Sequence, residues 1–123
     1  LRYCNAGHNP PYLFNQENGT SPKALTRTAL PLGLFDDQPW EMATVQIAPG
    51  DLLLLYSDGI VEAQDEELAL FGESYLQQLG HYCRPKSAPF IQEKIIDAVY
   101  DFVGDAEQSD DMTLMVLKRE EEK

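Results

Sequence analysis

The sequence is poor in basic residues, poor in cysteine, and has no long hydrophobic run. Only 9 Lys and Arg stand against 21 Asp and Glu among 123 residues, which gives a net charge of −12. A chain of this charge repels phosphate backbones and anionic membrane surfaces, so we expect neither nucleic-acid binding nor membrane binding. The same charge suits metal cations or basic partner surfaces. The alternative is that it only keeps the protein soluble.

The two cysteines, Cys4 and Cys83, are too few for a disulfide framework, and their spacing matches no zinc or redox motif. A reduced, cytoplasmic setting is therefore expected. The longest apolar run, residues 52–56, is far shorter than the ~20 residues of a membrane helix. No signal peptide is visible. Because the chain starts with Leu1 rather than Met, and already looks like a strand there, we expect it to begin inside a larger protein.

The first half of the chain predicts short strands separated by turns. Strands are expected at residues 1–4, 12–14, 23–25, 42–47 and 52–56, with a turn at 5–11 and a loop at 31–39. Asn18-Gly19 is a strong hairpin signal between the second and third strands. Residues 52–56 have no polar side, which predicts a central strand that is covered on both faces.

The second half of the chain predicts two helices and a final strand. Phe71, Leu76 and Leu79 recur with helical spacing, and Gly72 is a plausible start of the first helix. A second apolar stripe runs from residue 91 to 102 before Gly104. Residues 112–117 are expected to form the last strand. We divide the chain into one domain over residues 1–118 and a charged tail over 119–123.

This order of elements predicts an α/β (α+β) fold, with a mainly antiparallel sheet and two helices on one face. The other face of the sheet also needs cover, because residues 52–56 point apolar side chains both ways. We expect a partner chain or a further part of the domain to supply that cover. Formation of a homodimer through the uncovered face is left open.

Acidic residues stand at the ends of two predicted strands. Asp58 follows the most hydrophobic strand, and Gly59 beside it would let the chain turn sharply. Asp110 and Asp111 precede the last strand, and adjacent carboxylates repel each other unless a cation offsets their charge. If the two strands are neighbours, these carboxylates converge and favour hard divalent cations. Each motif taken alone is better explained as an ordinary turn, and His8 as a residue that satisfies backbone groups of its own turn.

Several segments, taken together and in order, resemble the PPM (PP2C-like) phosphatases, most nearly the bacterial stage II sporulation E / RsbU branch. The matching segments are NAGHNP at 5–10, LPLGL at 30–34, PGDLLLLYSDGIVEA at 49–63, FG at 71–72 and DDMTL at 110–114. They span nearly the whole chain with the usual spacing of that branch. The resemblance implies the C-terminal part of an αββα sandwich, in which two packed sheets are flanked by helices.

The resemblance also implies a dinuclear Mg²⁺ or Mn²⁺ site that hydrolyses phosphoserine or phosphothreonine on proteins. By resemblance, Asp58 and Asp110 are metal ligands. Glu62, Asp111, His8 and Gly59 are assigned to a secondary metal position or to the surroundings of the ligands. His8 and Glu62 fall where many eukaryotic relatives have carboxylates associated with a third, weaker metal, and the histidine at position 8 departs from that pattern.

The remaining ligands of such a phosphatase come from an N-terminal segment that this sequence lacks. We therefore expect residues 1–123 to be inactive alone and the parent protein to be an enzyme. Its expected partners are a phosphorylated protein substrate, such as an anti-sigma-factor antagonist, and an upstream sensor or receiver domain. The alternative is a degenerate phosphatase-like domain that binds a partner or senses a ligand without catalysis.

Overall fold

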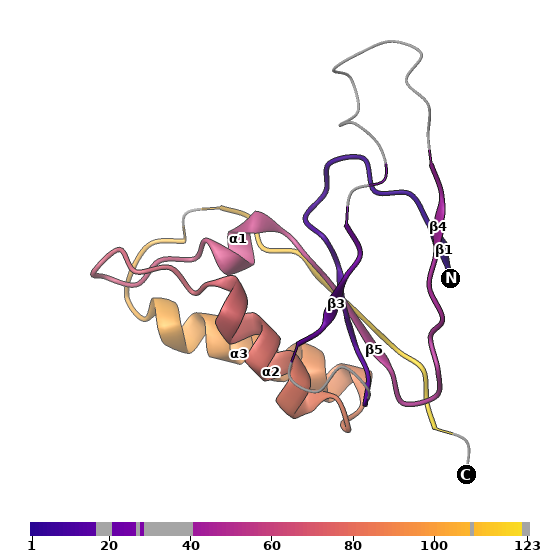
Figure 1. Cartoon of the computed structure of the whole chain (residues 1–123). Coiled ribbons are helices and arrows are strands. Elements are labelled where there is room, and N and C mark those ends of the chain that lie inside the picture. The colour runs from indigo at the N-terminus through magenta and orange to yellow at the C-terminus, as the bar shows by residue number, and fades with distance from the viewer. Residues whose placement is uncertain (17–20, 27, 29–40, 109, 122–123) are drawn as a thin grey trace.

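The computed structural model describes residues 1–16, 21–26, 28, 41–108 and 110–121 (Figure 1). In chain order the elements are β1 (Arg2–Tyr3), β2 (Tyr12–Phe14), β3 (Lys23–Ala24), β4 (Ala43–Thr44), β5 (Leu52–Tyr56), α1 (Asp58–Val61), α2 (Glu73–Cys83), α3 (Ala88–Val103) and β6 (Leu114–Lys118). The predicted Asn18-Gly19 turn, the loop at 31–39 and the segment at 30–34 lie outside the described residues.

The main sheet has the strand order β3-β2-β5-β6, and each neighbouring pair is antiparallel. β5 is central, since it pairs with β2 through Leu54 opposite Tyr12 and with β6 through Leu53 opposite Leu117. This confirms the predicted antiparallel sheet and the central strand. β1 and β4 form a separate two-stranded sheet, in which Arg2 lies opposite Thr44.

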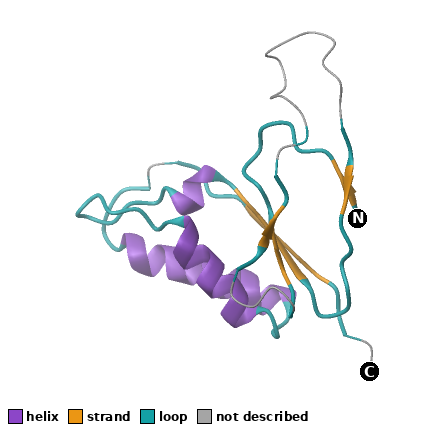
Figure 2. Ribbon diagram, viewed as in Figure 1, coloured by secondary structure: helices purple, strands orange, loops and turns teal. Residues whose placement is uncertain are grey.

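Helices α2 and α3 cover one face of the main sheet, as predicted (Figure 2). The core on this face joins Leu52 and Leu54 of β5 to Leu76 of α2 and to Ile95 of α3. These four side chains are fully buried, and burying one leucine or isoleucine stabilises a fold by about 1.5–3 kcal/mol. Gly80 of α2 allows a close approach, because a Cβ there would lie 2.3 Å from the ring of Phe14.

The second face of the sheet is covered in part by the chain itself. Leu13 and Leu53 point to this side and pack with Leu25 and with Val45, which follows β4. The expectation that all of this cover comes from outside the chain is therefore wrong, because β1, β4 and their flanking residues form a layer there (Figure 2). The cover ends at β6, where Met115 and Leu117 are 59% and 43% exposed beside an apolar hollow of about 410 Å³.

Several strand boundaries differ from the sequence-based prediction. β1, β3 and β4 are each two residues long and therefore shorter than the strands expected at 1–4, 23–25 and 42–47. β6 begins and ends later than expected and includes Lys118, whose ammonium donates to the carbonyls of Gly50 and Arg84. Arg119 continues the pairing, since its N–H donates to the Asp51 carbonyl at 3.1 Å. The short helix α1 directly after β5 was not predicted. Within the described ranges, no helix has the length and hydropathy needed to cross a membrane.

Candidate metal centre

Asp58 and the Asp110-Asp111 pair lie at the same end of the main sheet. β5 and β6 run antiparallel with Tyr56 opposite Leu114, so the residues after β5 meet the residues before β6. The ladder continues one step further, because the Ser57 N–H donates to the Thr113 carbonyl at 3.0 Å. The backbone thus brings together the acidic positions that the sequence suggested would converge.

Gly59 is the point of closest approach between these two segments. A Cβ built on Gly59 would lie 2.0 Å from the backbone carbonyl oxygen of Asp111. The expected reason for this glycine, a sharp turn, is wrong, because Gly59 lies inside α1 and is not one of the glycines with positive φ. Its function is to leave room for the Asp111 backbone.

Ser57 ties the same two segments together through its side chain. Its Oγ accepts a hydrogen bond from the Thr113 N–H at 2.9 Å and donates one to the Asp111 carbonyl at 3.3 Å. Ser57 precedes α1, but its side chain does not cap that helix. Ser57 was not predicted as a site residue; its signals in the sequence were its place next to Asp58 and inside the matching segment at 49–63.

Asp58 is the first residue of α1, and its side chain is exposed. Its Oδ1 accepts a hydrogen bond from the side-chain amide of Asn9 at 2.5 Å. Asn9 belongs to the turn before β2. Since β2 pairs antiparallel with β5, the start of β2 lies toward the end of β5 that carries Asp58. Asp58 therefore stands where segments from both neighbours of β5 meet.

The turn that carries Asn9 is built around the buried side chain of Asn5. The Asn5 Oδ1 accepts from the N–H groups of Gly7 and His8 at 3.2 and 2.9 Å, and its amide donates to the Leu25 carbonyl at 3.0 Å. The exposed ring of His8 lies with Nδ1 2.7 Å from the carbonyl oxygen of Asn9. Thus Asn9, which was not predicted as a site residue, links this turn to Asp58.

The other acidic positions are exposed and bonded locally. Asp110 Oδ1 accepts from the Asp111 N–H at 2.7 Å, and the Gln108 amide donates to the Asp110 carbonyl at 2.8 Å. Glu62 follows α1, and its N–H donates to the Asp58 carbonyl at 2.8 Å. The donors at this end are oxygens, which fit a hard divalent cation. Among the described residues, no group of three or more His, Cys, Asp or Glu side chains is arranged to hold a metal ion.

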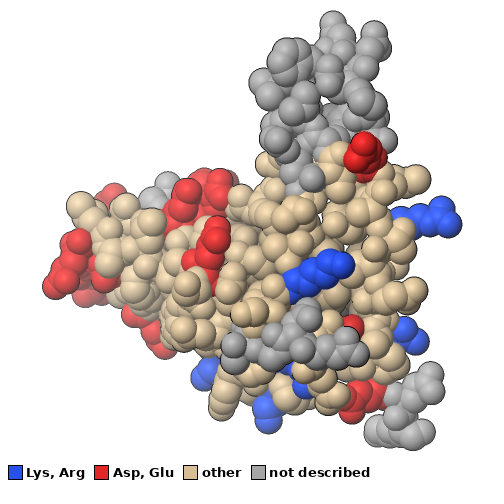
Figure 3. Space-filling model, in the orientation of Figure 1, with Lys and Arg blue, Asp and Glu red and all other residues tan. Residues whose placement is uncertain are grey.

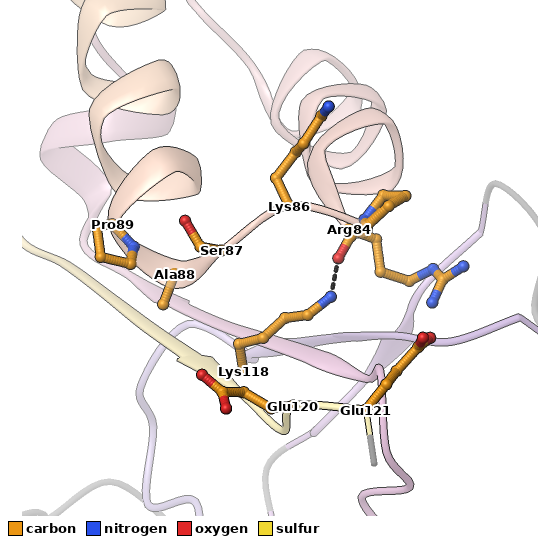
Figure 4. Close-up of a pocket in the computed structure, with 9 residues that line it drawn as sticks. Arg84, Lys86, Ser87, Ala88, Pro89, Lys118, Glu120 and Glu121 are labelled. Carbon is orange, nitrogen blue, oxygen red and sulfur yellow. Dashed lines mark hydrogen bonds between the residues drawn. The ribbon is translucent and has the colours of Figure 1, made fainter. Parts of the chain in front are cut away.

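Acidic and basic side chains are unevenly distributed over the surface. In Figure 3, Asp and Glu side chains gather over the end that carries α1, whereas Lys and Arg side chains lie over the sheet and elsewhere. A hollow of about 370 Å³ lies near the start of α3, lined by Arg84, Lys86, Lys118 and Glu121 among others (Figure 4). Lys118 pairs with Leu52, at the opposite end of β5 from Asp58, so this hollow is separate from the acidic end.

Comparison with known proteins identifies relatives over nearly the whole chain. The family model described as stage II sporulation protein E (SpoIIE) matches residues 1–120. The phosphoserine phosphatase RsbU of Bacillus subtilis is 31% identical over 119 residues, which cover 95% of this chain and 34% of that protein. Protein IcfG of Synechocystis sp. is 25% identical over 122 residues, 97% of this chain and 18% of that protein. The chain thus spans about a third or less of these relatives.

Solved structures share the fold. The SiaA-PP2C domain of Pseudomonas aeruginosa superposes with a TM-score of 0.80 at 19% identity, covering 95% of this chain and 45% of that one. The PP2C phosphatase domain of SpoIIE from Bacillus subtilis, solved with a fragment of its regulatory domain, gives a TM-score of 0.72 at 20% identity, covering 97% and 34%. At these identities the likeness concerns the fold alone.

Proposed function

The chain belongs to the stage II sporulation protein E (SpoIIE) family, and from this membership we propose that it is the C-terminal part of a metal-dependent protein phosphatase domain of the PPM (PP2C-like) type. In the complete domain the reaction is hydrolysis of phosphoserine or phosphothreonine on a signalling regulator. A relative named as a phosphoserine phosphatase, 31% identical over 95% of the chain, supports an enzyme rather than a non-catalytic binding domain.

One observation carries the proposal: Asp58 and Asp110 flank the same end of the antiparallel pair β5–β6. In the proposal both are ligands of Mg²⁺ or Mn²⁺, and Asp111, Glu62 and His8 are secondary or neighbouring groups. When bound, two such cations supply an activated water and neutralise phosphate charge. Asp58 and Asp110 are exposed, which leaves their carboxylates open to cations and to a phosphorylated side chain.

The described residues supply only part of the ligand set that the proposal requires. Each cation takes about six oxygen ligands, whereas Asp58 and Asp110 offer four carboxylate oxygens between them, one of which accepts from Asn9. The missing ligands would come from another part of the protein. We therefore expect the isolated segment to be inactive.

The proposed substrate is a phosphorylated regulatory protein, such as an anti-sigma-factor antagonist, and the proposed setting is the bacterial cytoplasm under an upstream sensor or receiver domain. The name of the relative RsbU supports phosphoserine as the target. The acidic surface around α1 would disfavour anionic substrates in general (Figure 3). Bound cations would reverse that charge locally, so substrate binding should require the metal.

Phosphate release from a phosphoserine peptide tests the proposal. We expect the intact protein to release phosphate in the presence of Mn²⁺, and phosphate release to stop when the metal is chelated. Residues 1–123 alone should release none. Metal-independent turnover by the intact protein, or full turnover by residues 1–123 alone, would contradict the proposal.

A further inference from the structure

We propose that Asn9 is a positioning residue for the Asp58 carboxylate. The inference rests on the proposed function, in which Asp58 binds a catalytic cation. Its own basis is the hydrogen bond from the Asn9 amide to Asp58 Oδ1, which joins positions 49 residues apart. In this arrangement the turn before β2 fixes the orientation of a ligand that is carried by the helix after β5.

Several hydrogen bonds of Asn5 hold the conformation of the turn that carries Asn9. Asn5 is only 5% exposed, and its side chain bonds to three backbone groups in the turn and in the neighbouring segment. The Asn5 N–H donates to the Thr28 hydroxyl, and the Thr28 N–H donates to the Asn5 carbonyl, both at 2.8 Å. Gly7 has a φ of 100°, a conformation that side chains disfavour. Asn9 is thus presented by a turn with little freedom to move.

The hydrogen bond decides which carboxylate oxygen is free. An amide N–H on a carboxylate is a charge-assisted bond, stronger than a bond between neutral groups. With Oδ1 held by Asn9, the side-chain torsions of Asp58 are restricted and Oδ2 is left to approach a cation. Donors of this kind orient the ligands of metal sites, and their removal typically costs about 10–100-fold in affinity or activity.

His8 is the competing assignment in the same turn. The family resemblance places His8, and not Asn9, near a metal. In the structure the His8 ring lies against the Asn9 carbonyl, and the amide of Asn9 reaches Asp58. The two assignments therefore make opposite predictions about which substitution weakens metal binding more.

Mn²⁺ binding to the intact protein, measured by isothermal titration calorimetry, tests the inference. The variants are Asn9→Leu, which keeps the size of the side chain without its donor, and Asn9→Ala, in case the leucine disturbs the turn. We expect Mn²⁺ to bind about tenfold more weakly to both, with melting temperatures of the metal-free proteins close to that of wild type. Gln46→Ala, which removes an exposed amide after β4, is the matched control and should bind as wild type.

The outcomes separate this inference from the function on which it rests. If wild type binds Mn²⁺ and Asp58→Ala binds it much more weakly, but the Asn9 variants bind as tightly as wild type, only the role of Asn9 is overturned. A larger loss from His8→Ala than from Asn9→Ala also overturns it. If wild type binds no Mn²⁺ at all, the proposed function fails and the role of Asn9 fails with it.

Discussion

The backbone carbonyl of Asp111 occupies the place where a side chain on Gly59 would stand. A Cβ at Gly59 would lie 2.0 Å from that oxygen and 2.7 Å from the carbonyl carbon, far inside van der Waals contact. The helix that starts with Asp58 and the segment that carries Asp110 can therefore approach each other only because residue 59 has no side chain. This contact links the local sequence Asp58-Gly59 to the geometry of the proposed metal site.

Substitution of Gly59 should separate the two acidic segments. We expect Gly59→Ala to lower the free energy of unfolding by about 1–3 kcal/mol, the usual effect of overpacking, and to remove most of the phosphatase activity of the intact protein. Chemical denaturation and phosphate release measure the two effects. Ser74→Ala, on the exposed surface of α2, is the control. Wild-type stability in Gly59→Ala would mean that the segments do not touch.

Ser57 should hold the start of β6. Ser57→Ala removes the acceptor of the Thr113 N–H and the donor to the Asp111 carbonyl, so we expect a loss of about 1–2 kcal/mol in unfolding free energy. Hydrogen exchange gives the sharper measurement, because the Thr113 amide should exchange faster.

The amide of Arg119, which bonds to Asp51 at the other end of the strand, is the internal control for this experiment. Its protection should not change in Ser57→Ala. Equal acceleration at both amides would mean a general loss of stability, and Ser57 would then have no specific role at the acidic end.

The two members of the aspartate doublet should differ. In the intact protein we expect Asp58→Ala and Asp110→Ala each to remove most activity, at least about tenfold, because each removes a ligand. Asp111→Ala should matter less, because the contacts recorded for Asp111 are made by its backbone. Asp105→Ala, an exposed acidic control, should keep wild-type activity. Equal losses of activity in Asp110→Ala and Asp111→Ala would contradict the assignment of Asp110 as the metal ligand of the pair.

Tyr56 should make the fold sensitive to alkaline pH. Burial raises the pKa of its hydroxyl above the ordinary value of 10.0, and the ring stacks on Tyr12 with centroids 5.2 Å apart. The stabilisation is complete below the pKa of the unfolded chain, about 10. It is lost as pH rises above that value, because the unfolded state then gives up a proton that the native state retains.

Tyr56→Phe should therefore flatten the fall in unfolding free energy above about pH 10. Urea titrations between about pH 8 and about pH 11, in steps of about one pH unit, measure this slope. Tyr82→Phe, which alters a tyrosine that is 69% exposed, should keep the wild-type slope. A Tyr56→Phe slope identical to wild type would contradict the assignment.

The sequence predicted those parts of the site that depend on neighbours along the chain. Asp58 stands out because it follows an uninterrupted apolar strand, and Asp110 because it precedes the next apolar segment after a helix. Their meeting required that β5 and β6 pair, which the sequence left as a condition. The absence of a polar side in β5 predicted a central strand but not which strands pair with it. The two helices were predicted for the same reason, since their apolar spacing and flanking glycines are local signals.

The parts that sequence analysis missed depend on distant contacts. Asn9 meets Asp58 across 49 residues, and Ser57 meets Asp111 across 54; no local pattern reports such pairs. Gly59 was noticed for the wrong reason, because a glycine needed for close approach looks in sequence like a glycine needed for a turn. The cover of the second sheet face was missed although strands were expected at 1–4 and 42–47, because no local pattern indicates that they pair with each other in a separate sheet.

A double-mutant cycle in Mn²⁺ affinity tests most directly whether Asp58 and Asp110 share cations. The intact protein, Asp58→Ala, Asp110→Ala and the double variant are titrated under the same conditions. Since residues that bind one ion act as a unit, the double variant should lose little more affinity than either single variant. Losses that simply add, or single variants that bind Mn²⁺ as wild type does, would contradict the shared site.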